Sequence, residues 1–303
     1  MKLVALAAMA VSCSRAHDDH PAAAPPPPPP PPATAKACTL APHALRRPQP
    51  RRLVAIGDLH GDLGGMRSAL RAAGAIDEHD TWIGRDLVVV QTGDILDRGD
   101  DERAMLDLVT KLERDARAAG GELIALVGNH ELMNAAGDFR YVTPHGRDDF
   151  DGERAKELGP GGVYAKRFAQ HDVVAIVGDT VFSHAGVLGD WVHHVDDANQ
   201  SSRCWLDGQA GDAGDPPAVL TAQDSPVWTR ATGGESIDCA QLQASLAALG
   251  VKRMVVGHTV QPHVNALCDG ALWRIDVGLA KEYGGPIEVL EVAPTVEVLH
   301  GTR

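Results

Sequence analysis

The chain has 303 residues, 44% of them hydrophobic and 23% charged, which excludes bulk disorder and leaves room for one large folded domain or two small ones. There are 28 Lys and Arg against 41 Asp and Glu, so the formal net charge is −13. A protein that binds nucleic acid by counterion release normally carries the opposite sign, and we expect no nucleic-acid partner.

The first 13 residues are typical of a signal peptide with a lipobox. Lys2 precedes an apolar run, 3–11, that is too short to span a bilayer. Small residues then precede Cys13, where a bacterial lipoprotein would be cleaved and lipidated. We therefore expect a cell-envelope protein that is either periplasmic or anchored through lipid on Cys13, its only expected membrane contact. Secretion after cleavage nearby, with loss of Cys13, is the alternative.

Residues 14–50 are expected to form a linker. Eight consecutive prolines, 25–32, favour polyproline II, which rises about 3.1 Å per residue and gives a stiff spacer of roughly 25 Å. A packed core cannot include such a stretch. The folded, catalytic domain is therefore predicted to cover residues 51–303.

From residue 51 onward, apolar runs alternate with amphipathic stretches. Apolar runs predict buried strands over 53–56, 87–90 and 123–127, and helices are predicted between them over 62–74 and 101–119. This βαβαβ order is typical of an α/β fold with a mainly parallel sheet and helices on both faces. Further strands are expected at 173–177, 180–183, 252–256, 271–276 and 286–292.

The stretch 187–235 is rich in Gly, Asp, Trp and Pro. It predicts a short helix near 190–206 and a long loop. We expect this segment to form a cap over the site.

Each of the first three strands ends in a polar motif: GDLHGD at 57–62, GDILDRG at 93–99 and GNHE at 128–131. The carboxyl ends of parallel strands form the edge at which open α/β sheets bind ligands, so the three motifs should converge. Two later histidines, His184 and His258, also follow predicted strands.

Six side chains in these segments can donate to a metal: Asp58, His60, Asp94, Asn129, His184 and His258. Carboxylate, amide and imidazole together suit Mn, Fe or Zn better than calcium, which prefers oxygen alone. Six donors are too many for one zinc and suit two ions that share a carboxylate, the usual apparatus of phosphoester hydrolysis. The predicted cofactor is two divalent metal ions.

The remaining polar residues of the motifs fit the same chemistry. Arg98 and Arg230 could bind phosphoryl oxygens, and His130 could protonate the leaving alcohol while Asp97 orients its ring and raises its pKa. Each signal is weak alone, because a lone strand-end histidine or an Asp-Arg pair usually has a structural role. The Asp and Asn donors, however, follow one another at 36 and 35 residues on successive strands, which favours one joint site.

Four further cysteines, Cys38, Cys204, Cys239 and Cys268, can pair in three ways in an oxidising compartment. We expect Cys204–Cys239, which would order the cap loop, and Cys38–Cys268, which would tie the N-terminal arm to the core. Four free, buried thiols are the alternative.

The motifs resemble the phosphoprotein phosphatase family of calcineurin-like metallophosphoesterases: GDxHG, GDxxDRG and GNHE, followed by two separated histidines, occur in order. Segments 93–102, 133–142, 227–230 and 255–261 look like the Shewanella-like protein phosphatases, a mostly bacterial branch. The similarity runs from about residue 53 to 292.

The resemblance implies a four-layer αββα sandwich in a single catalytic domain. It also implies a dinuclear-metal phosphatase that hydrolyses phosphomonoesters, with phosphoproteins (Ser/Thr or Tyr) or small phosphomonoesters as substrates. A phosphodiesterase or dinucleoside-polyphosphate hydrolase on the same metal site is the alternative. Asp97 separates the chain from the symmetrical dinucleoside tetraphosphatases, which have a different residue there.

The resemblance assigns roles to the matching positions of this chain. Asp94 would bridge two metals, His130 with Asp97 would be the acid pair, and Arg98 would clamp phosphate. The surroundings of Arg230 differ from those of the second arginine in the eukaryotic enzymes. The remaining metal ligands would be Asp58 and His60 on the first ion, and Asn129, His184 and His258 on the second.

Overall fold

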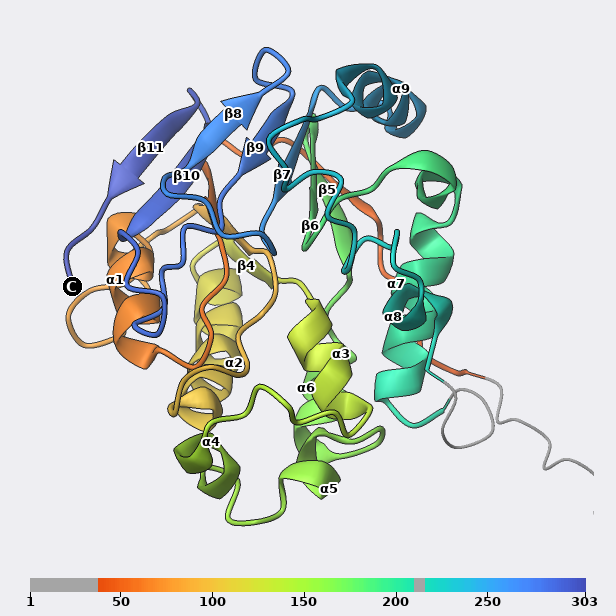
Figure 1. Cartoon of the computed structure of the whole chain (residues 1–303). Coiled ribbons are helices and arrows are strands. Elements are labelled where there is room, and N and C mark those ends of the chain that lie inside the picture. The colour runs from red at the N-terminus through yellow and green to blue at the C-terminus, as the bar shows by residue number, and fades with distance from the viewer. Residues whose placement is uncertain (1–37, 210–215) are drawn as a thin grey trace, which may run out of the picture. The chain divides into compact units, whose positions relative to one another are not determined.

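Two mixed β-sheets form the centre of the computed structural model, which describes residues 38–209 and 216–303 (Figure 1). In the five-stranded sheet, the three predicted N-terminal strands run parallel, as their βαβαβ order requires, and the two C-terminal strands are antiparallel. Its strand order is β11 (Glu297–His300), β10 (Glu288–Ala293), β2 (Leu53–Ile56), β3 (Val88–Gln91) and β4 (Glu122–Ala125).

The second sheet has six strands and is also mixed. Its three central strands β6, β7 and β9 are parallel, and antiparallel pairs β5–β6 and β8–β9 flank them. The strand order is β1 (Arg46–Arg47), β5 (Val174–Val177), β6 (Thr180–Ser183), β7 (Arg253–Val256), β9 (Leu272–Arg274) and β8 (Asn265–Leu267).

Helices flank the pair of sheets. Helices α1 (Leu63–Ala72) and α2 (Glu102–Ala118) lie on the five-stranded sheet, where α1 contacts β10 and α2 contacts β4; α7 (Val195–Leu206) contacts β5 of the other sheet. Strands β2 and β6 are buried on both faces, and residues of both sheets belong to one hydrophobic core. The result is the four-layer αββα arrangement, in which each sheet has helices on one face and the other sheet on its second face.

The shorter helices connect these layers. Helix α3 follows β4 directly and packs on α5, which in turn packs on α6. Their bounds are α3 (Asn129–Ala135), α4 (Pro144–Asp148), α5 (Arg154–Leu158), α6 (Val163–Phe168), η1 (Gly189–His193, a 3₁₀ helix), α8 (Ala218–Thr221) and α9 (Cys239–Leu249).

The prediction that segment 187–235 caps the site is wrong for its helical part. Helix α7 contacts β5 and α6, so it belongs to the outer helical layer of the six-stranded sheet (Figure 1). Within 187–235, the segment around Trp228 does approach the polar motifs, since its ring centroid lies 6.2 Å from that of His258. Residues 210–215 lie outside the described residues.

The N-terminal arm joins the fold earlier than predicted. Strand β1 pairs in parallel with β5, with Arg46 opposite Ile176, and the Arg203 side chain donates a hydrogen bond to the Ala41 carbonyl. Residues 38–50 therefore belong to the folded domain, because the open edge of β5 offers them backbone partners. The predicted signal peptide and proline run lie outside the described residues. No helix within 38–209 or 216–303 is long and apolar enough to cross a membrane.

The predicted disulfide pairing is wrong, and so is the alternative of free thiols. The disulfides are Cys38–Cys204 and Cys239–Cys268. The arm that contains Cys38 runs beside α7, while the start of α9 lies at the β8–β9 turn. Tertiary packing brings these segments together, and the spacing of the cysteines in the sequence does not predict that packing.

Replacing both Cys38 and Cys204 by serine should lower the free energy of unfolding by about 5 kcal/mol on the chain-entropy argument, because this bridge closes a separation of 166 residues in the unfolded chain. Cys239→Ser with Cys268→Ser, whose bridge closes 29 residues, is the matched variant and should lose about 1.5 kcal/mol less on the chain-entropy argument. Chemical denaturation without reductant measures both. The opposite ranking would contradict the argument.

Candidate metal centre

All six predicted metal ligands gather at the ends of strands. They follow β2, β3, β4, β6 and β7, so both sheets contribute to one site. Each is at most 9% exposed: Asp58, His60, Asp94, Asn129, His184 and His258.

Two glycines allow this convergence. A Cβ on Gly128 would lie 2.2 Å from Asp94 Oδ1, and a Cβ on Gly257 would lie 2.2 Å from Asp58 Oδ1. Any side chain at these two positions would therefore displace a carboxylate of the site. The close approach of backbone to carboxylate explains the glycines at these two positions.

The backbone of the site is strained. Ten non-glycine residues of the described chain have positive φ, a conformation that costs on the order of 1 kcal/mol or more for such residues. Five of the ten belong to the predicted site: His60, Asp94, Asp97, Arg98 and His258, with φ between 44° and 68°. Residues keep such a strained backbone conformation only where the surrounding contacts fix it.

Glu131 supplies much of that support. Its buried carboxylate accepts hydrogen bonds of 2.8–3.1 Å from four backbone N–H groups, those of Gly128, Asp94, Ile95 and Leu96. It thereby joins the loop after β3 to the start of α3. The sequence analysis assigned Glu131 no role, although it is the last residue of the GNHE motif.

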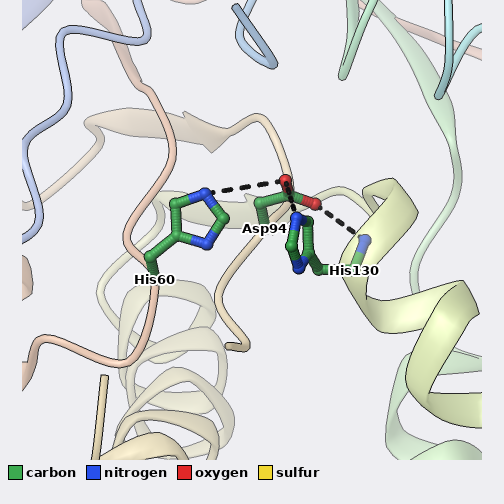
Figure 2. A group of neighbouring side chains, drawn as sticks. All are labelled: His60, Asp94 and His130. Carbon is green, nitrogen blue, oxygen red and sulfur yellow. Dashed lines mark hydrogen bonds and ion pairs between the residues drawn. The ribbon is translucent and has the colours of Figure 1, made fainter. Parts of the chain in front are cut away.

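Asp94 lies at the centre of a first group of donors, with His60 and His130 on either side (Figure 2). Its Oδ2 is 3.8 Å from His60 Nε2 and 3.7 Å from His130 Nε2, while Oδ1 accepts the backbone N–H of His130 at 3.0 Å. Asp58 Oδ2 adds a further oxygen 4.0 Å from His60 Nε2.

A second group shares the same carboxylate. His184 Nε2 lies 3.2 Å from Asp94 Oδ2, 2.8 Å from Asn129 Oδ1 and 3.0 Å from His258 Nδ1. Four side chains, three from loops after strands and one from the start of α3, therefore aim donor atoms at one point. Asp94 is the residue common to both groups.

The chemistry of these donors fits cations. His184 Nδ1 and His60 Nδ1 each lie 3.0 Å from a carbonyl oxygen, of Thr92 and Leu96, to which they must donate. In the neutral rings, Nε2 then carries a lone pair and faces carboxylate or amide oxygens, an arrangement that is repulsive without positive charge between them. His258 Nε2 is buried and has no hydrogen-bond partner in the described part of the chain.

The pKa values agree with this interpretation. Burial lowers the pKa of His60 to about 4 and that of His258 to about 3, so both rings are neutral at pH 7, the form in which imidazole can bind a cation. Burial opposes ionisation of Asp94, but the imidazoles of His184, His130 and His60 hold its pKa well below the usual range. Burial raises the pKa of Asp58 well above the usual range, and Asp276 and Asp94 add to this; bound cations would reverse it.

His130 and Asp97, predicted as an acid pair, contact each other. His130 Nδ1 donates to Asp97 Oδ2 at 2.5 Å, and Asp97 is fully buried. His130 Nε2 is thereby left facing Asp94 and the donor groups. Burial opposes protonation of His130, but Asp94 and Asp97 raise its pKa above the usual value.

Both predicted phosphate-binding arginines lie at the edge of the site. The Arg98 guanidinium packs 4.2 Å from the ring centroid of Tyr141 and borders a cleft of about 390 Å³ that also includes His60. Arg230 is exposed and donates to Thr259 Oγ1 at 3.2 Å, one residue beyond His258. The two arginines thus approach the donor groups from the loop after β3 and from the segment before α9.

Besides Glu131, three further buried residues with ionisable side chains near the site were not predicted from the sequence: Glu102, Arg154 and Asp276. Asp276 follows β9, so its position after a strand could have indicated it; burial raises its pKa to about 6. Glu102 stands beside the DRG motif, and Arg154 lies in a polar stretch without any motif. Nothing in the sequence points to Arg154.

Comparison with known proteins agrees with the geometry. The sequence model of the calcineurin-like phosphoesterase family matches residues 51–262. The chain is 38% identical to Shewanella-like protein phosphatase 2 of Arabidopsis thaliana, over 82% of this chain and 76% of that protein. It is 30% identical to Shewanella-like protein phosphatase 1 of Plasmodium berghei, over 78% and 69% of the two chains.

A solved structure is similar throughout the fold. The cold-active protein-tyrosine phosphatase of a psychrophilic Shewanella species superimposes with a TM-score of 0.74 at 25% identity, over 85% of this chain and 83% of that one. A protein serine/threonine phosphatase from Saccharomyces cerevisiae shares the fold, with a TM-score of 0.60 at 16% identity over 86% of this chain and 85% of that one.

Proposed function

The chain belongs to the calcineurin-like phosphoesterase family, in its Shewanella-like protein phosphatase branch, and we propose that it removes phosphate from phosphorylated proteins. It is a metallophosphoesterase with a buried His/Asp metal-binding site. The observation that carries the proposal is the pair of donor groups that share Asp94, because two neighbouring cations are the usual requirement for hydrolysing a phosphate ester.

We assign the proposed metal ligands to the two donor groups according to where their nitrogen and oxygen lone pairs point. Asp58 and His60 would hold the first ion, Asn129, His184 and His258 would hold the second, and Asp94 would serve both. When bound, two divalent ions, Mn, Fe or Zn, supply positive charge that stabilises the phosphoryl oxygens and activates water.

The protein groups bind the phosphoryl group and move one proton. Arg98 and Arg230 provide planar donors for the phosphoryl oxygens. Water adds to phosphorus as the bond to the leaving oxygen breaks, and that oxygen keeps the electron pair and takes the proton from His130 Nε2. The added water gives up one proton, which returns to His130 and restores the acid. Asp97 holds Nδ1 and so keeps Nε2 directed at the reacting group.

The proposed substrates are phosphomonoesters on proteins, on serine, threonine or tyrosine, and small phosphomonoesters. The relatives in this branch carry the name of protein phosphatases, and the similar Shewanella structure is that of a protein-tyrosine phosphatase. The His130–Asp97 pair favours esters with poor leaving groups, which need a proton on the departing oxygen. Hydrolysis of phosphodiesters or dinucleoside polyphosphates on the same site is the second candidate, because the metal centre serves both reactions.

A substrate panel on metal-stripped and manganese-loaded protein tests the proposal. We expect the stripped protein to be inactive, and the loaded protein to bind two equivalents of metal and to cleave phosphoserine or phosphotyrosine peptides. We expect bis(p-nitrophenyl) phosphate and diadenosine tetraphosphate to react far more slowly. Faster cleavage of these two would favour the second candidate, and activity in the stripped protein would contradict both.

The two disulfides are consistent with a location outside the cytoplasm. We propose more narrowly that the protein is an envelope lipoprotein anchored at Cys13, with a free periplasmic form as the alternative. The apolar run 3–11 and the small residues before Cys13 support this. Globomycin, which blocks lipoprotein signal peptidase, should leave the precursor uncleaved; unchanged processing would contradict the anchor.

A further inference from the structure

A buried ionic network lies directly behind the acid pair. Asp97 and Glu102 are both 0% exposed and Arg154 is 5% exposed, yet all three have ionisable side chains. Burying charges costs several kcal/mol per ion unless they are paired and hydrogen-bonded, so such a cluster needs a reason. None of these residues contacts solvent freely, and Glu102 and Arg154 have no part in the proposed metal or phosphate binding.

The two oxygens of Asp97 have separate tasks. Oδ2 accepts the His130 Nδ1 proton at 2.5 Å, while Oδ1 faces away from His130 and accepts from Asn134 Nδ2 at 3.0 Å, with Arg154 Nη2 at 3.4 Å. The carboxylate is therefore held from behind at the one oxygen that His130 does not use. Any rotation of the carboxylate would break these contacts.

Arg154 also fixes the orientation of Asn134. The Asn134 carbonyl oxygen accepts from Arg154 Nε at 2.9 Å and from Nη2 at 2.7 Å. Since an amide has its acceptor and its donor on opposite sides, this contact turns the Asn134 amino group toward Asp97 and toward the carbonyl of His130, 2.9 Å away. Arg154 thus acts on Asp97 both directly and through Asn134.

Glu102 completes the network at the backbone. It accepts the N–H of Asp97 at 2.5 Å and forms a two-pronged ion pair with Arg154, whose Nη2 lies 3.0 Å from Glu102 Oε1 and whose Nη1 contacts Oε2. Arg154 also packs over the ring of Phe150, 5.1 Å from its centroid. Backbone and side chain of Asp97 are both held by groups that depend on one guanidinium.

We propose that Arg154, with Glu102 and Asn134, is the positioning device of the acid pair, so that it sets how well His130 delivers a proton to the leaving oxygen. This proposal rests on the proposed function, since it concerns the same acid. Arg154 does not touch the substrate and acts only through Asp97 and His130. Its loss should therefore matter most where proton delivery limits the rate.

The test compares two esters that differ in leaving group. Arg154→Met should lower kcat on a phosphoserine peptide, whose alkoxide leaves poorly, by about 10²-fold, the lower range for loss of acid catalysis, and should lower kcat on p-nitrophenyl phosphate by about fivefold or less. KM should change little for either. Arg203→Met, a buried arginine in α7 that donates to Ala169 and Ala41, is the matched control and should show no such selectivity.

A second variant covers the case in which Arg154→Met does not fold. Glu102→Gln with Arg154→Met removes both charges of the ion pair and keeps an acceptor for the Asp97 N–H, so no buried carboxylate is left opposite a missing guanidinium. The same leaving-group selectivity is expected. In a protein that already carries His130→Asn, Arg154→Met should lower kcat on the phosphoserine peptide by less than about twofold more, because the imidazole that Arg154 positions is already absent.

The outcomes separate the two proposals. If the wild-type protein cleaves both esters and the Arg154 variants slow both by the same factor, or fail to fold in both forms, the network has only a structural role and the positioning proposal is overturned. A full additional loss in the His130→Asn background overturns it as well. If the wild-type protein cleaves neither ester with metal bound, the proposed function itself fails, and the positioning proposal fails with it.

Discussion

Asp94→Asn is expected to lower kcat on any phosphomonoester by about 10³-fold, because the substitution removes the one charge shared by both donor groups, and stabilisation by the two ions contributes several kcal/mol. The amide keeps the shape of the carboxylate but turns a donor NH₂ toward a site of lone pairs. Metal content, measured by elemental analysis after dialysis, should fall below two equivalents together with the activity.

Asp172→Asn is the matched control for this substitution. Asp172 is 4% exposed and lies 3.2 Å from His43, outside the metal centre. It should change stability without changing metal content or the specific activity of the folded protein. Wild-type activity and metal content in Asp94→Asn would refute the shared-carboxylate site.

His130→Asn is expected to slow hydrolysis of a phosphoserine peptide by about 10³-fold and that of p-nitrophenyl phosphate much less. The asparagine amide can still reach Asp97, but it has no proton to give at the position of Nε2. Because p-nitrophenolate leaves without assistance, the ratio of the two losses reports proton delivery specifically. Steady-state kinetics on both substrates with saturating manganese measures that ratio.

His171→Asn provides the comparison. His171 is 8% exposed, and its Nε2 lies 2.8 Å from Glu113, so it is another buried histidine paired with a carboxylate, but neither residue belongs to the polar motifs or to the two donor groups. Its replacement should leave the ratio of the two rates unchanged. An equal loss on both substrates in His130→Asn would argue against an acid role and for metal binding, since His130 belongs to the first donor group.

The secondary structure was largely predictable from the chain. The helices predicted at 62–74 and 101–119 occur as α1 and α2, and their ends move by only one or two residues. Asp62 begins α1 by accepting the Gly65 N–H, a local contact. The strand and helix order predicted one mainly parallel sheet with helices on both faces, whereas the structure has two sheets packed together. The sequence does not distinguish these cases, because a strand covered by a second sheet and a strand covered by helices are both continuously apolar.

The sequence alone determined which polar side chains follow strands, and the spacing of Asp58, Asp94 and Asn129 reflects the parallel order of β2, β3 and β4, which brings these three proposed ligands to one sheet edge. The packing of the second sheet adds His184 and His258 to them. Tertiary structure alone decided the contacts between segments with no such rule. These contacts are the pairing of the cysteines, the pairing of β1 with β5, and the approach of Arg154 to Asp97. Each of these contacts depends on which surfaces, far apart in the sequence, pack together. A sequence motif encodes the local backbone shape but does not specify its distant neighbour.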